Sequence, residues 1–349
     1  MIEQYDYKLP ERLIAKVPAV PRDSARLFVY DTRSDTVTFD TFLHLDRHLP
    51  KKSLLVFNNT KVVPARLWLT KESGGKIQVF LMMNELRPDD VLVKGIVDRK
   101  LVVGAKLFFK TGAFLEVTRQ EEQFFFFKPS VQREELWGLL SKEGVTPIPP
   151  YIKESPLSEP TLRAKYQSVL AKYPASVAAP TASLHFSKRL LKKLEASQIK
   201  KTEVTLHVGA GTFAPIDESN IAAQKLFTEY YRIEDSAADS INTAHKEHVA
   251  VVPVGTTALR TLESAMRGAK DDNLTPREDK TDIFIFPPYQ FKVADALITN
   301  FHVPKSSLML LVDAFLEHKK AKRRIIDLYK IAIKNDFRFY SFGDGMLIK

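Results

Sequence analysis

Cysteine is absent from all 349 residues of the chain. Its absence excludes disulfide bonds, thiolate zinc sites, iron–sulfur clusters and cysteine nucleophiles together. Long hydrophobic runs are missing as well, since no window approaches the roughly 18 apolar residues that a membrane-spanning helix needs. The first residues, MIEQYDYKLPERLIAK, lack the apolar core of a signal peptide. We therefore expect a cytoplasmic protein that does not associate with a membrane.

Basic residues outnumber acidic ones, 52 to 42, and the formal net charge is +10. A basic surface suits a polyanionic partner such as nucleic acid, because lysine and arginine displace the counterions that condense on a phosphate backbone. The alternative is that the charge only keeps the protein in solution. Composition alone leaves both interpretations open.

The chain is long for a single hydrophobic core, so two domains are expected. Residues 65–128 contain six short β-rich runs separated by turn residues, which is typical of a small barrel or sandwich. After a proline-rich tract at 146–158, strand and helix patterns alternate, which favours a largely parallel sheet. We predict an α/β main domain formed by residues 1–62 and 146–349, with an inserted all-β, barrel-like domain at 63–145.

Four consecutive phenylalanines, Phe124 to Phe127, form the last β-rich run. Strand alternation alone would place only two of them in a core. We expect packing on both faces, with an exposed stacking platform for nucleic-acid bases as the alternative.

Glycine is scarce, at 13 residues, so glycines that stand beside polar residues are informative. The segment 204–213, VTLHVGAGTF, is predicted to be a strand that ends in Gly209 and Gly211. Glycines let the backbone approach a ligand closely, and ligand sites of α/β folds lie beyond the carboxyl ends of strands. His207 at the strand end supports a site here, although glycine pairs also occur in ordinary tight turns.

Two further segments, 249–260 and 296–307, have a similar form. In the first, a strand ends at Gly255, and Thr256 or Thr257 is predicted to cap a helix whose free N–H groups suit a carboxylate or phosphate. An ordinary helix cap is the favoured alternative. In the second, a strand-like run ends at Asn300 and His302, before a helix that starts near residue 306.

Three histidines, His185, His207 and His302, fall at junctions between predicted elements of the α/β domain. None is paired with a second histidine or a carboxylate at the helical spacing of metal ligands. We therefore predict no metal site.

Together, these segments resemble the S-adenosylmethionine:tRNA ribosyltransferase-isomerase family of queuosine synthesis. The resemblance runs from end to end and keeps the order of the family's motifs. It is carried by YDYKLPERLIAKVPAVPRDSARLFVYD, LLVFNNTKVVPARL, GGKIQV, PPYI, SVAAPTASLHF, VTLHVGAGTFAPI, VGTTALRTLES, TDIFIFPPYQFKVADALITNFHVPKSSLMLLVDAF and YSFGDGMLI.

The resemblance implies an α/β domain with an inserted β-barrel and an unusual use of S-adenosylmethionine. The ribosyl moiety would be transferred to, and isomerised on, 7-aminomethyl-7-deazaguanine at the wobble position of tRNA. The products would be epoxyqueuosine-tRNA, adenine and methionine. S-Adenosylmethionine is then a consumed co-substrate and no cofactor is expected. The implied partners are that tRNA and S-adenosylmethionine, with the protein acting as a monomer.

The resemblance also implies roles for individual residues, because the reaction needs a base for the ribose C5′ proton and a locus for the methionine carboxylate. The acid/base candidates are His207, His185, His302, Glu229 and Asp295, with Asp344 behind them. The candidates for binding S-adenosylmethionine are Gly209, Gly211, Thr212, Gly255, Thr256, Thr257, Arg260 and Asn300. The candidates for binding RNA are Arg22, Arg26, Asn58, Asn59, Lys61 and Arg66.

The chain departs from the family pattern at five positions. Ser183 replaces a glycine, and Gly345 replaces an alanine. The family's MHSE motif reads LFTE, so Phe227 replaces its histidine while Glu229 is kept. An earlier histidine and a glycine are replaced by Gln224 and Pro288. We expect divergence with activity retained.

Two alternative functions remain. One is an S-adenosylmethionine-dependent RNA methyltransferase, although the glycine loop stands far later in the chain than in such enzymes. The other is a non-catalytic RNA-binding protein built on the β-rich insertion, which would leave the polar strand ends unexplained.

Overall fold

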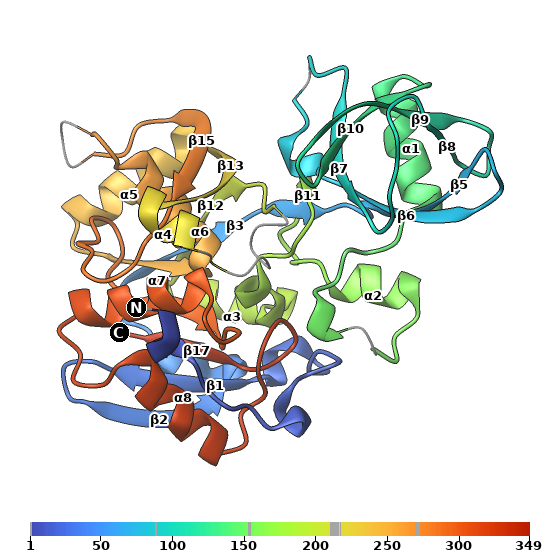
Figure 1. The fold of residues 1–349 in the computed structure, drawn as a ribbon. Helices are drawn as coiled ribbons and strands as arrows, with labels where there is room; N and C mark the ends of the chain where they lie inside the picture. The colour runs from blue at the N-terminus through green and yellow to red at the C-terminus, as the bar shows by residue number, and fades with distance from the viewer. Residues whose placement is uncertain (1, 88, 153–154, 210–215, 217, 270–272) are drawn as a thin grey trace.

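The computed structural model describes residues 2–349 except 88, 153–154, 210–215, 217 and 270–272. An α/β body contains both termini, and a β-barrel lies beside the end of its sheet that carries β12 and β13 (Figure 1). Among the described residues, no helix has the length and apolar character to cross a membrane. The predicted fold class, an α/β domain with a small all-β barrel, is confirmed.

The body is built on a nine-stranded sheet with the order β15-β13-β12-β3-β14-β16-β17-β1-β2. The strands β12, β3, β14 and β16 are mutually parallel. Strands buried on both faces form near-continuous apolar runs, and β3 is buried at all six positions. The bounds, in sheet order, are Arg277–Ile283, Lys225–Ile233, Lys200–Leu206, Ser53–Asn58, Ala250–Val254, Leu297–Asn300, Gly345–Ile348, Arg26–Asp31 and Thr36–Thr41.

Helices cover both faces of this sheet. Alternate residues of the parallel strands point to opposite sides, so Val56 packs with α5 and α6 while Leu55 and Phe57 pack with α3. The helices α7 and α8 cover the part of the sheet formed by β1, β16 and β17. The bounds are α2 Glu159–Lys165, α3 Lys188–Ala196, α4 Glu218–Ala223, α5 Asp235–Lys246, α6 Thr256–Ala265, α7 Ser307–His318 and α8 Ile325–Lys334.

The barrel is closed and antiparallel, in the order β10-β7-β6-β5-β8-β9. Its strands alternate between buried and exposed residues, and the helix α1 (Arg133–Glu143) contributes three buried leucines to its core. The bounds are β5 Arg66–Lys71, β6 Lys76–Leu81, β7 Val93–Val97, β8 Lys106–Phe108, β9 Phe114–Glu121 and β10 Phe124–Pro129. All of these elements fall within the predicted insertion, 63–145.

The phenylalanines of β10 divide between the two faces of the barrel wall. Phe125 and Phe127 are buried in the barrel core. Phe124 and Phe126 are half-buried on the outer face, beneath the Lys94 ammonium at 4.0 Å and the Arg119 guanidinium at 3.9 Å. The expectation of core packing on both faces therefore holds only for the inner pair, because cations cover the outer rings.

Short elements connect the two parts of the molecule. The strand β4 (Thr60–Val62), just before the barrel, pairs in parallel with β11 (Tyr173–Ser176), which follows it. The remaining elements are the 3-10 turns η1 Ile2–Tyr5, η2 Glu11–Leu13, η3 Arg22–Ser24, η4 Phe42–Arg47, η5 Met83–Glu85, η6 Pro150–Ile152 and η7 Thr181–His185.

Candidate functional site

The carboxyl ends of β12, β3, β14 and β16 meet at one edge of the sheet, because these strands run in parallel. The strand ends of all three predicted motifs lie at this edge, and the first motif is described there as far as Gly209. One cavity there is lined by residues from all three segments. They include Val208, Gly255, Thr256, Thr257, Asn300 and His302.

The second motif forms the start of α6. Gly255, at φ +95°, is the N-cap residue and the helix begins at Thr256, so neither threonine is the cap that the sequence predicted. A left-handed φ of this kind favours glycine. The Thr257 side chain is buried, and its Oγ1 has no hydrogen-bond partner among the described residues. The N–H groups of the first helical turn and this hydroxyl therefore provide polar contacts at the edge of the sheet.

A buried ion pair joins the first and second motifs. Glu229 on β13 accepts hydrogen bonds from the Gly209 N–H at 2.8 Å and from Arg260 Nη1 at 2.6 Å. Both side chains are about 5 % exposed, so each charge depends on the other for stabilisation. In the described part of the chain, Arg260 Nε and Nη2 have no hydrogen-bond partner. Those two nitrogens form the side-on fork that matches a carboxylate or phosphate.

His207 follows β12 and is only partly buried. Its Nδ1 lies 2.9 Å from Thr60 Oγ1, which donates to Ser176 Oγ at 2.8 Å. Because the single hydroxyl proton of Thr60 is used in that bond, Thr60 accepts from the His207 Nδ1–H, and Nε2 keeps its lone pair. Burial lowers the pKa of His207 to about 4, so the ring is neutral at pH 7. A neutral imidazole with a free Nε2 lone pair can act as a general base.

His185 and His302 are more deeply buried than His207. His302 Nε2 lies 2.8 Å from Thr299 Oγ1, and burial lowers its pKa to about 3. His185 Nε2 accepts from Asn300 Nδ2 at 3.2 Å, and its ring stacks on Phe42 with centroids 4.3 Å apart. Burial, with the charge of Arg338, lowers the pKa of His185 to about 3. Asn300 Oδ1 is buried without a partner among the residues that the structure describes.

The chain matches the family model described as queuosine biosynthesis protein over residues 2–348. It is 42 % identical to the S-adenosylmethionine:tRNA ribosyltransferase-isomerases of Carboxydothermus hydrogenoformans and Aquifex aeolicus, with 99 % of each chain covered. The chain belongs to the queuosine biosynthesis protein family. The crystal structure of S-adenosylmethionine tRNA ribosyltransferase from Thermotoga maritima is 28 % identical, with a TM-score of 0.54, and covers 99 % of this chain and 100 % of that one.

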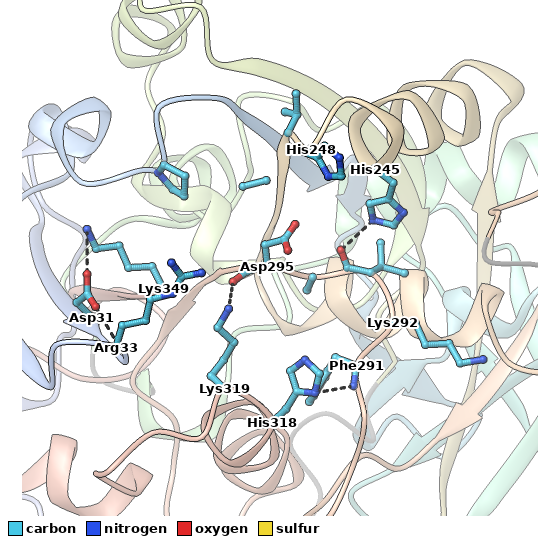
Figure 2. A pocket seen from close by; sticks show the side chains of 15 residues that line it. Asp31, Arg33, His245, His248, Phe291, Lys292, Asp295, His318, Lys319 and Lys349 are labelled. Atoms are coloured by element: carbon cyan, nitrogen blue, oxygen red, sulfur yellow. Dashed lines mark hydrogen bonds and ion pairs between the residues drawn. The ribbon is translucent and has the colours of Figure 1, made fainter.

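Asp295 lies away from the candidate site, at the amino ends of the parallel strands. It precedes β16, and its N–H and Oδ2 bond to the backbone of Val251, near the start of β14, at 2.9 and 2.8 Å. Figure 2 shows it among Lys319, His318 and His245. We therefore remove Asp295 from the acid/base candidates.

Asp344 lies at the correct edge, but its carboxylate is used structurally. It accepts from the N–H groups of Arg26 and Arg338 at 3.0 and 2.8 Å and forms an ion pair with the Arg338 side chain. It is 1 % exposed. These bonds hold the start of β1 to the segment before β17.

Most of the predicted RNA contacts have partners within the protein. Arg22 donates to the carbonyl oxygens of three residues at 164–167, and Arg26 donates to the Asn335 carbonyl and stacks on Phe337. Asn58 bonds to the backbone of Leu206 and Thr60. These contacts organise the fold, and the assignment of these three residues to RNA binding stays a prediction.

The remaining RNA candidates differ in their exposure. Asn59 is buried and bonds to the side chains of Glu203 and Thr205. Lys61 is exposed, and Arg66 lies half-buried above the Phe80 ring. Lys61 and Arg66 stay predictions. Gly211 and Thr212, predicted to contact S-adenosylmethionine, lie outside the described residues.

Two of the departures from the family pattern lie around His185. A Cβ atom on Gly345 would be 2.7 Å from Phe42 Cζ and 3.2 Å from His185 Nε2. Glycine at 345 thus leaves space for the Phe42 ring, which the Cβ atom of a larger residue would contact. Ser183, in place of a glycine, is fully buried with an Oγ that has no partner in the described ranges.

The other departures, at Gln224, Phe227 and Pro288, lie on or near β13 and in the segment after β15. Phe227 on β13 is 38 % exposed, and Gln224 adopts a left-handed φ of +53° just before that strand. Tyr289, beside Pro288, donates to the buried Glu263 at 3.2 Å. These features do not involve Arg260 or His207.

The structure adds three residues that the sequence analysis did not select. Thr60 and Ser176 orient His207, and Asn84 of the barrel lies against Gly209. Thr60 directly follows a buried strand, a position that could have indicated it. Ser176 opens the segment SVAAPTASLHF, and no local pattern indicates Asn84, whose contact is with a distant segment.

Proposed function

We propose that the chain is an S-adenosylmethionine:tRNA ribosyltransferase-isomerase. It transfers the ribosyl moiety of S-adenosylmethionine to 7-aminomethyl-7-deazaguanine at the wobble position of tRNA and isomerises it. The products are epoxyqueuosine-tRNA, adenine and methionine. The observation that carries the proposal is the 42 % identity, over 99 % of both chains, with enzymes of that name.

Arg260 is the proposed partner of the methionine carboxylate. Its Nε and Nη2 lack partners among the described residues, although the side chain is buried. Buried donors without acceptors are costly, and a carboxylate would satisfy both in a bidentate contact. Thr257 Oγ1 and the N–H groups at the start of α6 are proposed to share this anionic group. Asn300 Oδ1 is a further acceptor for a polar group of S-adenosylmethionine.

His207 is the proposed general base. The reaction removes a proton from the ribose C5′, which the adjacent sulfonium makes acidic. The hydrogen bond with Thr60 leaves His207 Nε2 unprotonated, and the lowered pKa keeps the ring neutral. His302 and His185 are also neutral candidates, but their hydrogen bonds to Thr299 and Asn300 involve Nε2.

Glu229 is proposed to position the site rather than to transfer a proton. Its two carboxylate oxygens bind the Gly209 N–H and Arg260 Nη1. The carboxylate thereby fixes the end of β12 relative to the start of α6. This arrangement holds the Arg260 guanidinium at a fixed position relative to the segment that contains His207.

The cellular location, oligomeric state and metal content are proposed together with the reaction. We propose that the enzyme acts in the cytoplasm, as a monomer, and without a metal cofactor. The described residues contain no group of three or more histidine, aspartate or glutamate side chains placed to hold a metal ion.

Product analysis tests the proposed reaction. The protein is incubated with S-adenosylmethionine and tRNA that carries the deazaguanine precursor. Release of adenine and methionine is expected. S-Adenosylhomocysteine would instead indicate methyl transfer, and retained tRNA binding without turnover would indicate an RNA-binding protein.

A further inference from the structure

The barrel places one side chain at the reaction edge of the α/β body. Asn84 lies on η5, the turn that follows β6, and is 3 % exposed. A Cβ atom on Gly209 would be 2.8 Å from Asn84 Nδ2. A larger residue at 209 would therefore crowd this amide, which lies against the segment that follows β12.

Contacts on both sides hold the η5 turn in place. The Arg87 guanidinium lies 4.2 Å from the ring centroid of Tyr230, the residue after Glu229 on β13. On the barrel side, the Met82 N–H donates to the Lys94 carbonyl at 2.8 Å, and Lys94 forms an ion pair with Glu85 at 3.1 Å. Asn84 is thus carried by a turn that is fixed to the strand bearing Glu229.

The amide oxygen of Asn84 has no partner in the part of the chain that the structure describes. Oδ1 is buried and accepts no hydrogen bond from those residues. The nearby Gly209 N–H already donates to Glu229, so it does not satisfy this acceptor. A buried acceptor left without a donor is costly, so such atoms in a native structure call for an explanation.

We propose that Asn84 is a substrate-binding residue, contributed by the barrel to the ribosyl-transfer site, whose Oδ1 accepts a hydrogen bond from a substrate N–H group. The donor belongs to the deazaguanine of the tRNA or to S-adenosylmethionine, both of which present N–H groups. The inference rests on the proposed function. It makes the site a composite of the two parts of the chain, completed only when η5 lies against β13.

Two variants test this assignment with the full-length protein. Asn84→Ala removes the acceptor. Asn84→Ser keeps an uncharged oxygen acceptor on a shorter side chain, so no charge is buried at this position. KM is measured separately for S-adenosylmethionine and for precursor tRNA, using adenine release. We expect Asn84→Ala to raise the KM of one substrate about tenfold, and Asn84→Ser to raise the KM of that substrate by a smaller factor. The substrate whose KM rises identifies the donor.

Arg87→Ala loosens the same turn without removing the acceptor, so it measures how far KM depends on the position of η5. A purely structural role for Asn84 predicts that KM rises by the same factor for both substrates, and equally in Asn84→Ala and Asn84→Ser. That result, or unchanged KM values for both substrates in Asn84→Ala, would overturn the assignment. If Asn84→Ala does not fold, a KM raised equally for both substrates in Asn84→Ser overturns it instead. Wild-type adenine release tests the proposed function independently.

Discussion

His207 differs from the two other histidines of the site in its burial and its bonding. His185 and His302 lie at least nine-tenths buried, each with Nε2 in a hydrogen bond, whereas His207 is bonded through Nδ1 and is partly exposed. The ring nitrogen that remains free decides which histidine can accept a proton from a substrate. Of the three, His207 is the one whose Nε2 stays outside the hydrogen bonds between described residues.

Replacement of His207 by alanine should therefore reduce kcat by about two to four orders of magnitude, as expected for loss of a general base. Adenine release under saturating substrates is the measurement. Circular dichroism and the melting temperature should stay close to those of the wild type, because the ring is partly exposed. A His207→Ala variant with wild-type kcat would remove this residue from the mechanism.

At the scale of elements, a buried ion pair links β13 to α6. Glu229 and Arg260 have side-chain exposures of 4 % and 6 %. A charge left alone in such a place is strongly destabilising. The pair therefore supports the geometry of the site only while both partners are present.

Glu229→Gln should lower the free energy of unfolding by about 3 kcal/mol, because the Arg260 charge then lacks its counterion. It should also raise the KM for S-adenosylmethionine. Denaturant unfolding measures the first effect and initial rates the second. Asp336→Asn, in the exposed pair with Arg12, provides the control, with an expected loss of less than about 0.5 kcal/mol. Equal effects in the two variants would contradict this account.

Gly345 at the start of β17 lies against the Phe42 ring of η4. Gly345→Ala should lower the free energy of unfolding by about 1–3 kcal/mol, because the added methyl group meets Phe42 Cζ at 2.7 Å. At Gly138 in α1, an added Cβ atom would have no described neighbour within 4 Å. Gly138→Ala should therefore raise stability by about 0.5–1 kcal/mol through helix propensity. Denaturant unfolding measures both, and a change of the same sign in both variants would argue against steric contact as the cause.

The elements could be predicted from the sequence where a local periodicity controls them. Strand alternation indicates the barrel, and the amphipathic pattern at 187–197 indicates the helix α3, where Ser187 Oγ accepts from the Leu190 N–H. Asp295 precedes β16 rather than following it, so it lies at the other end of this strand from Asn300. The contacts of Asn84 and Ser176 could not be predicted, because their partners are more than 30 residues away in the chain.

At the scale of the whole molecule, three histidines with lowered pKa values make folding sensitive to acid. Burial lowers the pKa values of His207, His185 and His302 to about 4, 3 and 3, from an unfolded value of 6.5. Below pH 6.5 the unfolded chain binds protons that the folded chain does not. Stability is therefore highest above pH 6.5 and falls as the pH decreases toward 4.

Each of the three histidines should contribute on the order of 1 kcal/mol of lost stability per pH unit in that window. Denaturant titrations between pH 7.5 and 4.5 measure the slope. Glu263, whose pKa burial raises to about 7, offsets part of this slope because its folded form holds a proton that the unfolded form releases. His302→Gln removes one of the titrating groups and should reduce the slope by about 1 kcal/mol per pH unit. A stability that stays constant across this range would show that these histidines do not control the acid response.

The strands β4 and β11 have a consequence for how the molecule responds to RNA. They enclose the barrel in the chain, and they also supply Thr60 and Ser176, the two hydroxyls that set the tautomer of His207. A change in the pairing of β4 with β11 would separate these two hydroxyls and change which nitrogen of the His207 ring carries the proton. The tautomer of one side chain is therefore held by the same strand pair that closes the connection to the barrel.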